Sequence, residues 1–337
     1  MDRNTYFGIF LRGLAMGAAD VVPGVSGGTI AFITGIYERL LGAISSINFS
    51  LISVLKEKGI IGVWKQVDGN FLAALLSGIL VSILSLANLI TLLIIYYPIQ
   101  LWSFFFGLII ASIWYVGKEI KNWHIGVPLG IIVGAALVVL LTIMPPMSPD
   151  TSLLYLFFCG AIAACAMILP GISGSFILLI LGAYSTVIAA VADRNILIIM
   201  SVGIGAVLGL ISFSKFLNFL LRKYHNTLIG VLTGFLVGSL WKIWPWKADP
   251  IIYEKDFGER GIESISQTHQ SLSALTPNGG REFFDQYKAY IEHNVSPWRY
   301  EEINMMTDAQ IPGALIFCVI GFALIFVVEF VAKKKNV

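Results

Sequence analysis

Residues 17–28 read GAADVVPGVSGG, and residues 164–175 read ACAMILPGISGS. The two stretches share a Pro-Gly-x-Ser-Gly motif at a fixed offset of 147 residues. Each motif interrupts a longer apolar region, 5–45 in the first case and 151–192 in the second. Because proline ends a helix and glycine allows a sharp turn, each region is predicted to be a hairpin of two half-helices joined at the motif.

The composition indicates that these hairpins lie in a membrane. Of 337 residues, 57% are hydrophobic and 12% are charged, and the mean hydropathy is +0.83. Soluble domains carry about 25% charged residues, so the composition excludes a soluble enzyme, a disordered chain, a secreted disulfide scaffold and a nucleic-acid binder. The three cysteines lie in apolar stretches without CxxC spacing. We therefore expect a polytopic membrane protein with no metal and no cofactor.

Six further segments are long enough to cross the bilayer, for which roughly 20 apolar residues are needed. They are residues 71–97, 98–117, 124–145, 196–221, 226–245 and 311–332. The long polar stretch 247–310 holds eleven acidic residues against six Lys and Arg, which predicts a small folded insertion outside the membrane. The hairpins 5–45 and 151–192 could each be re-entrant or a pair of full spans, since charge does not separate the two arrangements.

Basic residues near the ends of the spans predict the orientation. Lys333, Lys334 and Lys335 follow the last span and place the C-terminus in the cytoplasm. The insertion 247–310 is then exofacial, and the N-terminus is cytoplasmic. The expected location is the cytoplasmic membrane, which the chain crosses several times.

The chain is predicted to consist of two copies of one unit, residues 1–146 and 147–337. The register of the motifs extends outward to other matched positions, and beyond a gap the offset becomes 127 residues. The matched pairs include Gly13 and Gly160, Gly35 and Gly182, Tyr37 and Tyr184, and Gly107 and Gly234. Three crossings per copy is an odd number, so the copies are inverted. The expected fold is an all-α polytopic membrane protein with two inverted-topology repeats, each a re-entrant broken hairpin plus three transmembrane helices, which is typical of secondary transporters.

The motif loops are predicted to bind an anion. The serine of each motif can cap the half-helix that follows, whose first N–H groups and dipole favour negative charge, and the glycines let an anion approach the backbone. The predicted binding residues are Ser26, Gly27, Gly28, Thr29, Ser173, Gly174 and Ser175, with hinges at Pro23, Gly24, Pro170 and Gly171. The alternative is that the loops are tight hairpin tips that pack against each other.

Four ionisable residues near the first hairpin are further candidates, because charges in membrane segments are costly. Asp20 could hold a proton or cation, or could be a hydrogen-bond partner of the turn. Glu38 and Arg39 follow Tyr37 at the hairpin exit, where Arg39 could bind a phosphate. Arg12 either reaches the cytoplasmic interface or faces the site.

The PGVSGGT run with its preceding Ala-Ala-Asp, the second PGISGS copy and the overall layout resemble the PopT family of polyprenyl-phosphate transporters. The resemblance covers nearly the whole chain. It implies movement of undecaprenyl phosphate, a lipid carrier of cell-wall synthesis, from the outer to the inner leaflet for reuse. It also implies roles for the two loops and for Asp20, Glu38 and Arg39. The expected partners are the polyprenyl phosphate and membrane lipids, and a homo-oligomer is left open.

Two enzyme classes and a small-anion carrier or channel are the alternatives. The GxSG sequences resemble the nucleophile motif of rhomboid proteases, which need a base, usually histidine, on a neighbouring span. The four histidines lie elsewhere, at span ends (His124 and His225) or in the insertion (His269 and His293). The loops also resemble those of undecaprenyl-diphosphate phosphatases, but these carry an arginine that both loops here lack. The sequence therefore favours a transporter over an enzyme.

Overall fold

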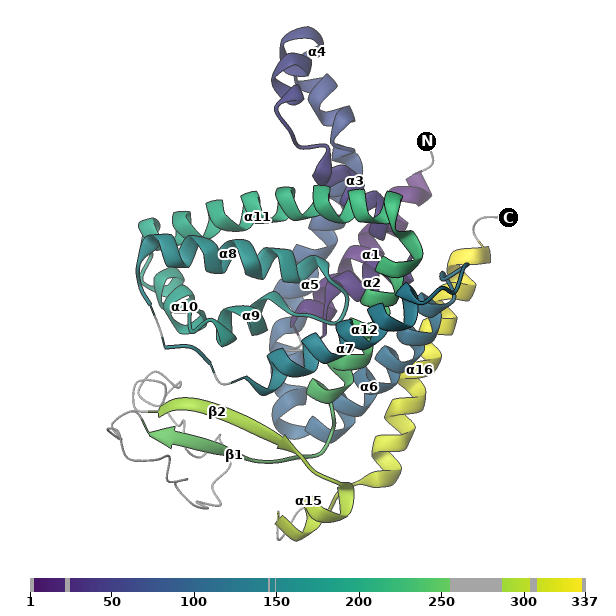
Figure 1. Cartoon of the computed structure of the whole chain (residues 1–337), viewed down its shortest axis with the longest axis vertical. Helices are drawn as coiled ribbons and strands as arrows, with labels where there is room; N and C mark the ends of the chain where they lie inside the picture. The colour runs from purple at the N-terminus through teal and green to yellow at the C-terminus, as the bar shows by residue number, and fades with distance from the viewer. Residues whose placement is uncertain are drawn as a thin grey trace.

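The computed structural model describes residues 3–21, 25–144, 146–148, 150–254, 287–303 and 308–334, and most of them are helical (Figure 1). The first half contains α1 (Arg3–Val21), α2 (Gly27–Ile33), α3 (Tyr37–Ser45), α4 (Ser50–Gln66), α5 (Gly69–Tyr96), α6 (Pro98–Gly117) and α7 (Gly126–Ile143). The second half contains α8 (Leu153–Ile168), α9 (Gly174–Ile180), α10 (Tyr184–Ala192), α11 (Ile196–Lys223), α12 (His225–Lys242), β1 (Lys247–Glu254), β2 (Tyr287–Asn294), α15 (Pro297–Ile303) and α16 (Ile311–Lys334).

Both apolar hairpins are broken where the motifs predict. The first breaks between α1 and α2 and the second between α8 and α9, while the hinge residues Pro23 and Gly24 lie outside the described residues. Each hairpin also has a second break that the sequence analysis did not predict. It lies at Gly35 in one copy and at Gly182 in the other, with φ values of +70° and +66°. The matched pair of glycines could have predicted this second break, because a residue in the left-handed region, usually glycine, commonly ends a helix.

The predicted spans are confirmed in part. By length and composition, four helices can cross a membrane, at Gly69–Leu86, Pro98–Gly117, Gly126–Ile143 and Ile196–Lys223, and up to six spans result if two bent helix pairs are counted. The bent pairs are α3 with α4, at 94°, and α9 with α10, at 110°. α16 is apolar over Ile311–Val327 but shorter. Among the described helices, α12 is not apolar enough to be counted as a membrane span. It begins at His225 and ends at Lys242, and much of its length is buried in protein.

Matching helices of the two halves pack in matching ways. α1 lies along α5, and α8 lies along α11. A Cβ atom added at Gly13 would strike the Leu75 carbonyl of α5, and one added at Gly160 would strike the Val202 carbonyl of α11. Glycine thus allows the same close approach of backbones in both pairs.

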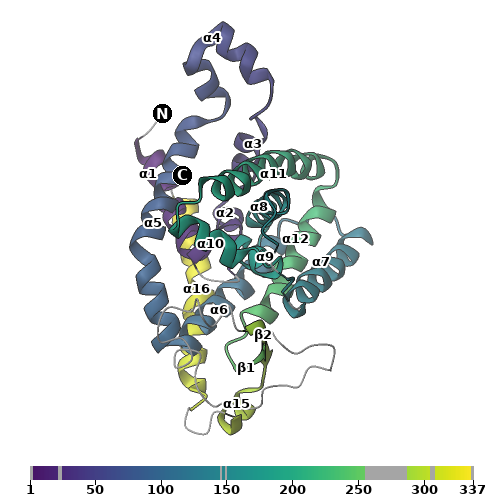
Figure 2. The same cartoon turned by 90° about the vertical axis from the view of Figure 1, so that its left-hand side faces the viewer.

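The last helices of the two halves are exchanged. α7 packs against α12 of the second half, and α16 packs against α6 of the first half (Figure 2). Gly107 of α6 meets the Cys318 carbonyl of α16, and the matched Gly234 of α12 meets the Ile131 carbonyl of α7. Neither half therefore forms a separate compact unit.

The long axis of the molecule separates its two ends. α5 runs along this axis, and α11 runs across it (Figure 1). The start of α1, the end of α16 and the projecting α4 lie toward one end, whereas β1, β2 and α15 lie toward the other. The described part of the insertion is thus on the side opposite the two chain ends.

The insertion begins and ends as a packed structure. β1 and β2 pair antiparallel, which adds strands to a fold expected to be all-α. The indole N–H of Trp244 donates to the Val295 carbonyl at 2.8 Å, and that of Trp246 donates to the Ala309 carbonyl at 2.9 Å. These bonds fix the stem of the insertion to the ends of α12 and α16.

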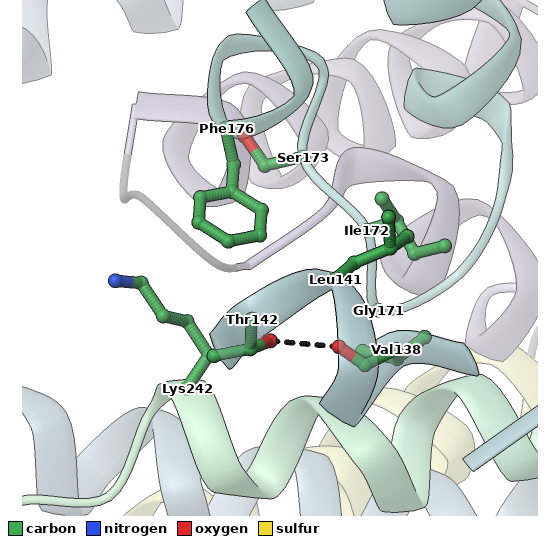
Figure 3. Close-up of a pocket in the computed structure, with 8 residues that line it drawn as sticks. All are labelled: Val138, Leu141, Thr142, Gly171, Ile172, Ser173, Phe176 and Lys242. Atoms are coloured by element: carbon green, nitrogen blue, oxygen red, sulfur yellow. Dashed lines mark hydrogen bonds between the residues drawn. The ribbon is translucent and has the colours of Figure 1, made fainter. Parts of the chain in front are cut away.

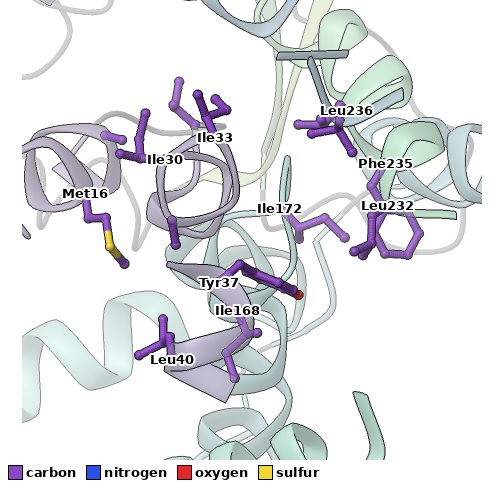
Figure 4. Close-up of a cluster of buried hydrophobic side chains, with 14 of the residues drawn as sticks. Met16, Ile30, Ile33, Tyr37, Leu40, Ile168, Ile172, Leu232, Phe235 and Leu236 are labelled. Carbon is purple, nitrogen blue, oxygen red and sulfur yellow. The ribbon is translucent and has the colours of Figure 1, made fainter. Parts of the chain in front are cut away.

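The main hydrophobic core lies where both hairpins meet α12 (Figure 4). Ile30 and Tyr37 come from the first hairpin, Ile168 and Ile172 from the second, and Leu232 from α12, and all five are buried. The core therefore brings the two motif loops to the same place.

Candidate functional site

The two motif loops contact each other through hydrogen bonds between the halves of the chain. The Ser26 hydroxyl donates to the Leu169 carbonyl at 3.0 Å. In return, the Gly171 N–H donates to the Thr29 hydroxyl oxygen at 3.0 Å. Side chains of the first loop thereby satisfy main-chain groups of the second, as expected for hairpin tips that pack together.

The first loop is closed on itself as well. Asp20 accepts a hydrogen bond from the Gly27 N–H at 2.7 Å, and Ser26 accepts one from the Gly28 N–H at 3.1 Å. Ser26 and Thr29 have no exposed surface. A Cβ atom at Gly28 would strike the Ile168 carbonyl. The first N–H groups of α2, predicted to receive an anion, are thus bound by the protein's own oxygen atoms.

The second loop has a different environment. Ser173 occupies the N-cap position of α9 with an extended backbone, but in the described structure its side chain makes no capping hydrogen bond. Its hydroxyl lies 2.8 Å from that of Ser175, which is exposed, and either oxygen could be the donor. Gly171 has a φ of +81° and lies against the Phe235 carbonyl of α12. The side chains of this loop are therefore less engaged with the rest of the protein.

A small cavity borders the second loop (Figure 3). It is lined by Val138, Leu141, Thr142, Gly171, Ile172, Ser173, Phe176 and Lys242. The ammonium nitrogen of Lys242 lies 5.1 Å from the centre of the Phe176 ring, a distance typical of a cation–π contact. The Thr142 hydroxyl donates to the Val138 carbonyl at 2.8 Å.

Sequence reasoning did not select Lys242, Thr142 or Phe176. Lys242 lies in the last turn of its helix, which is also where a lysine extends to the membrane interface, so its position alone did not mark a site. Only the fold brings the ends of α7 and α12 to the motif loop. The motif itself pointed correctly to one side of the cavity, through Gly171 and Ser173.

The remaining candidates lie apart from this cavity. Arg39 forms a bidentate pair with Asp68, with N–O distances of 2.6 and 3.1 Å, and its guanidinium lies 4.4 Å from the centre of the Phe71 ring. Glu38 lies 3.9 Å from His225. Arg12 is half-buried on α1. α3, which carries Glu38 and Arg39, lies next to α4 at the end of the molecule from which α4 projects (Figure 1).

Comparison with known proteins identifies the family. A family profile described as VCA0040-like, undecaprenyl phosphate translocase-like, matches residues 16–260. A polyprenyl-phosphate transporter of Vibrio cholerae serotype O1 is 41% identical over 329 residues, which cover 98% of each chain. A polyprenyl-phosphate transporter of Staphylococcus aureus is 35% identical over 254 residues, 70% of this chain and 85% of the relative. No solved structure matches significantly.

The matched segment includes both motif loops, the cavity and the start of the insertion. It also spans more than half of the chain. The chain therefore belongs to the undecaprenyl phosphate translocase-like family.

Proposed function

We propose that this protein moves a polyprenyl phosphate from the outer to the inner leaflet of the cytoplasmic membrane, which returns the lipid carrier for reuse in cell-wall synthesis. The observation that carries the proposal is the contact between the two motif loops, beside a small cavity lined in part by Lys242. The names of the two transporter relatives supply the substrate class.

The physical task fits such an arrangement. The prenyl tail is soluble in lipid at every depth, so the main barrier is the passage of the phosphate through hydrocarbon, where an unpaired charge is very costly. Polar groups held inside the protein lower that barrier if the tail can remain outside. The proposal includes no covalent step, and in the described structure the hydroxyls of Ser26 and Ser173 bond to carbonyls and to Ser175 rather than to a histidine.

The inverted repeat is part of the proposal, with residues 1–146 and 147–337 as its two copies. The matched packing of α1 on α5 and of α8 on α11 supports it. α5 and α11 are each 28 residues long, or about 42 Å at 1.5 Å per residue. A helix of that length covers a hydrocarbon core of about 30 Å at a tilt of about 45°, so two helices that cross each other can both span the bilayer.

The proposed orientation has both chain ends in the cytoplasm and the insertion outside. The start of α1 and the end of α16 lie at one end of the molecule and the described part of the insertion at the other, which agrees with the basic residues after the last span. A cysteine at Ser271 in a cysteine-free background should react with an impermeant maleimide in intact cells. Reaction only after lysis would reverse the orientation.

Transport is tested with purified protein in liposomes that carry fluorescent undecaprenyl phosphate. We expect the protein to accelerate exchange of the label between leaflets, measured by quenching from outside, and to leave the phosphate ester intact. Protein-free liposomes and liposomes with heat-inactivated protein are the controls. Hydrolysis of undecaprenyl diphosphate without movement of the monophosphate would replace the transporter with a phosphatase.

A further inference from the structure

The hydroxyl group of Tyr37 is buried in the core without a hydrogen-bond partner. Tyr37 begins α3 and is 3% exposed, and its hydroxyl makes no hydrogen bond to any residue that the structure describes. Its ring packs in one cluster with Ile172 of the second hairpin and Leu232 of α12, and Figure 4 shows the oxygen on the side of the ring that faces Leu232. A polar group buried without a partner destabilises the arrangement that buries it.

Two other buried hydroxyls, Ser82 and Ser103, also lack a partner in the described structure but differ in kind. Both lie within helices, where a serine hydroxyl can turn to the carbonyl one turn earlier, as Ser112 does to the Leu108 carbonyl at 2.6 Å. The Tyr37 hydroxyl stands at the end of a rigid ring and cannot reach the backbone of its own helix. Only a change in what surrounds the ring can give this hydroxyl a partner.

The surroundings of Tyr37 change if the two hairpins separate. In the closed arrangement described here, Ser26 bonds to the Leu169 carbonyl and the Gly171 N–H bonds to Thr29 across the contact between the hairpins. Separation breaks these bonds, but it also lets the Tyr37 hydroxyl find a partner. Favourable bonds and an unfavourable burial thus oppose each other in one contact, which brings two arrangements of a protein close in free energy.

We propose that Tyr37 is a conformational switch residue, whose unpaired hydroxyl destabilises the closed arrangement and favours an open one in which the hairpins are apart and the hydroxyl is hydrogen-bonded. The use of this equilibrium to pass a lipid headgroup rests on the proposed function. The matched Tyr184, which begins α10, is 40% exposed. The same burial is therefore not repeated in the second hairpin.

Thermal unfolding of the purified full-length protein in detergent tests the cost of the burial. Tyr37→Phe removes the hydroxyl and keeps the ring, so we expect the melting temperature to rise by about 1–3 °C. Tyr184→Phe is the matched control and should change it by less than about 1 °C. A lower melting temperature for Tyr37→Phe would mean that an ordered water stabilises the hydroxyl, which overturns the inference.

The reactivity of a buried cysteine measures the equilibrium directly. Val25 lies in the first motif loop and has no exposed surface. A cysteine at this position, with the three native cysteines replaced, reacts with N-ethylmaleimide only when the hairpins separate. Tyr37→Phe should slow this reaction about tenfold, as expected for relief of one unpaired buried hydroxyl, and Tyr184→Phe should leave it unchanged.

A cysteine at Ile172, which is 5% exposed on the other side of the contact, is the second reporter, and gel filtration checks the fold of each variant. Equal reaction rates with and without the Tyr37 hydroxyl overturn the inference. The same slowing in Tyr37→Phe and Tyr184→Phe also overturns it, because the effect then does not depend on burial.

Transport assays distinguish this inference from the proposed function. Wild-type protein should move undecaprenyl phosphate about tenfold faster than Tyr37→Phe, because the open arrangement becomes rarer in the variant. If wild-type protein moves the lipid but Tyr37→Phe changes neither melting temperature nor cysteine reactivity, the inference is wrong and the function stands. If both change as expected in a protein that moves no lipid, the inference stands and the transport function is wrong.

Discussion

The two motif loops have nearly the same sequence but different surroundings. In the first, Ser26 bonds to the opposite loop and Asp20 holds the start of α2. In the second, Ser173 pairs only with a neighbouring serine in the described structure and borders a cavity with Lys242. Two loops of nearly equal sequence thus differ through the residues around them, which bond the first loop into the fold and leave the second beside a cavity.

The largest expected effect on stability comes from disrupting the tightly packed first loop. A Cβ atom at Gly28 would strike the Ile168 carbonyl, whereas one at Gly42, in α3, meets nothing within 4 Å. Gly28→Ala should therefore destabilise the protein by about 3 kcal/mol or more, as overpacking of a rigid site does. Thermal unfolding in detergent measures this, with Gly42→Ala as the control. Equal melting temperatures for the two variants would contradict the close contact.

The serine variants compare the two loops directly. Ser26→Ala leaves the Leu169 carbonyl and the Gly28 N–H without their hydroxyl partner, which should cost about 1–3 kcal/mol of stability. Ser173→Ala removes a hydroxyl whose partner in the described structure, Ser175, is exposed and can bond to water, so it should cost less stability than Ser26→Ala and weaken farnesyl phosphate binding instead. Melting temperature and affinity are measured on both variants. The reverse pattern, with binding lost through Ser26, would exchange the roles of the loops.

Variants of Asp20 distinguish a role in capping the start of α2 from a role in binding a proton or cation during transport. Asparagine keeps the oxygen that accepts from Gly27, so Asp20→Asn should retain transport within about threefold, while Asp20→Ala should lose about 1 kcal/mol of stability with the cap. Initial transport rates between pH 6 and 8 are the measurement. A complete loss of transport in a well-folded Asp20→Asn protein would indicate that the carboxylate carries a proton or cation.

The smallest effect is expected at Arg39. Its side chain and that of Asp68 are 39% and 37% exposed, and exposed ion pairs contribute about 0.2–1 kcal/mol. Arg39→Gln should thus lower stability slightly and leave farnesyl phosphate binding unchanged. A large loss of affinity would place the phosphate near α3 instead.

The sequence predicted the elements of the site better than their roles. Local chain chemistry explains the Pro-Gly break and the serine at the start of each half-helix. Both features, and their repetition, are visible in the motif. The difference between Ser26 and Ser173 is not, because the partners of Ser26 are carbonyls more than 140 positions away. Lys242 joins the site only through the packing of α12, and the same packing explains why α12 carries polar ends yet is mostly buried.

The exchange of the last helices has a consequence for biosynthesis. During translation, α6 emerges long before α16, which is its main packing partner. The glycine surface of α6 around Gly107 must therefore remain uncovered, or be covered by lipid or an insertion factor, until the final helix leaves the ribosome. A chain that stops within the insertion would lack α16, so only a chain that includes α16 can reach the native packing of α6.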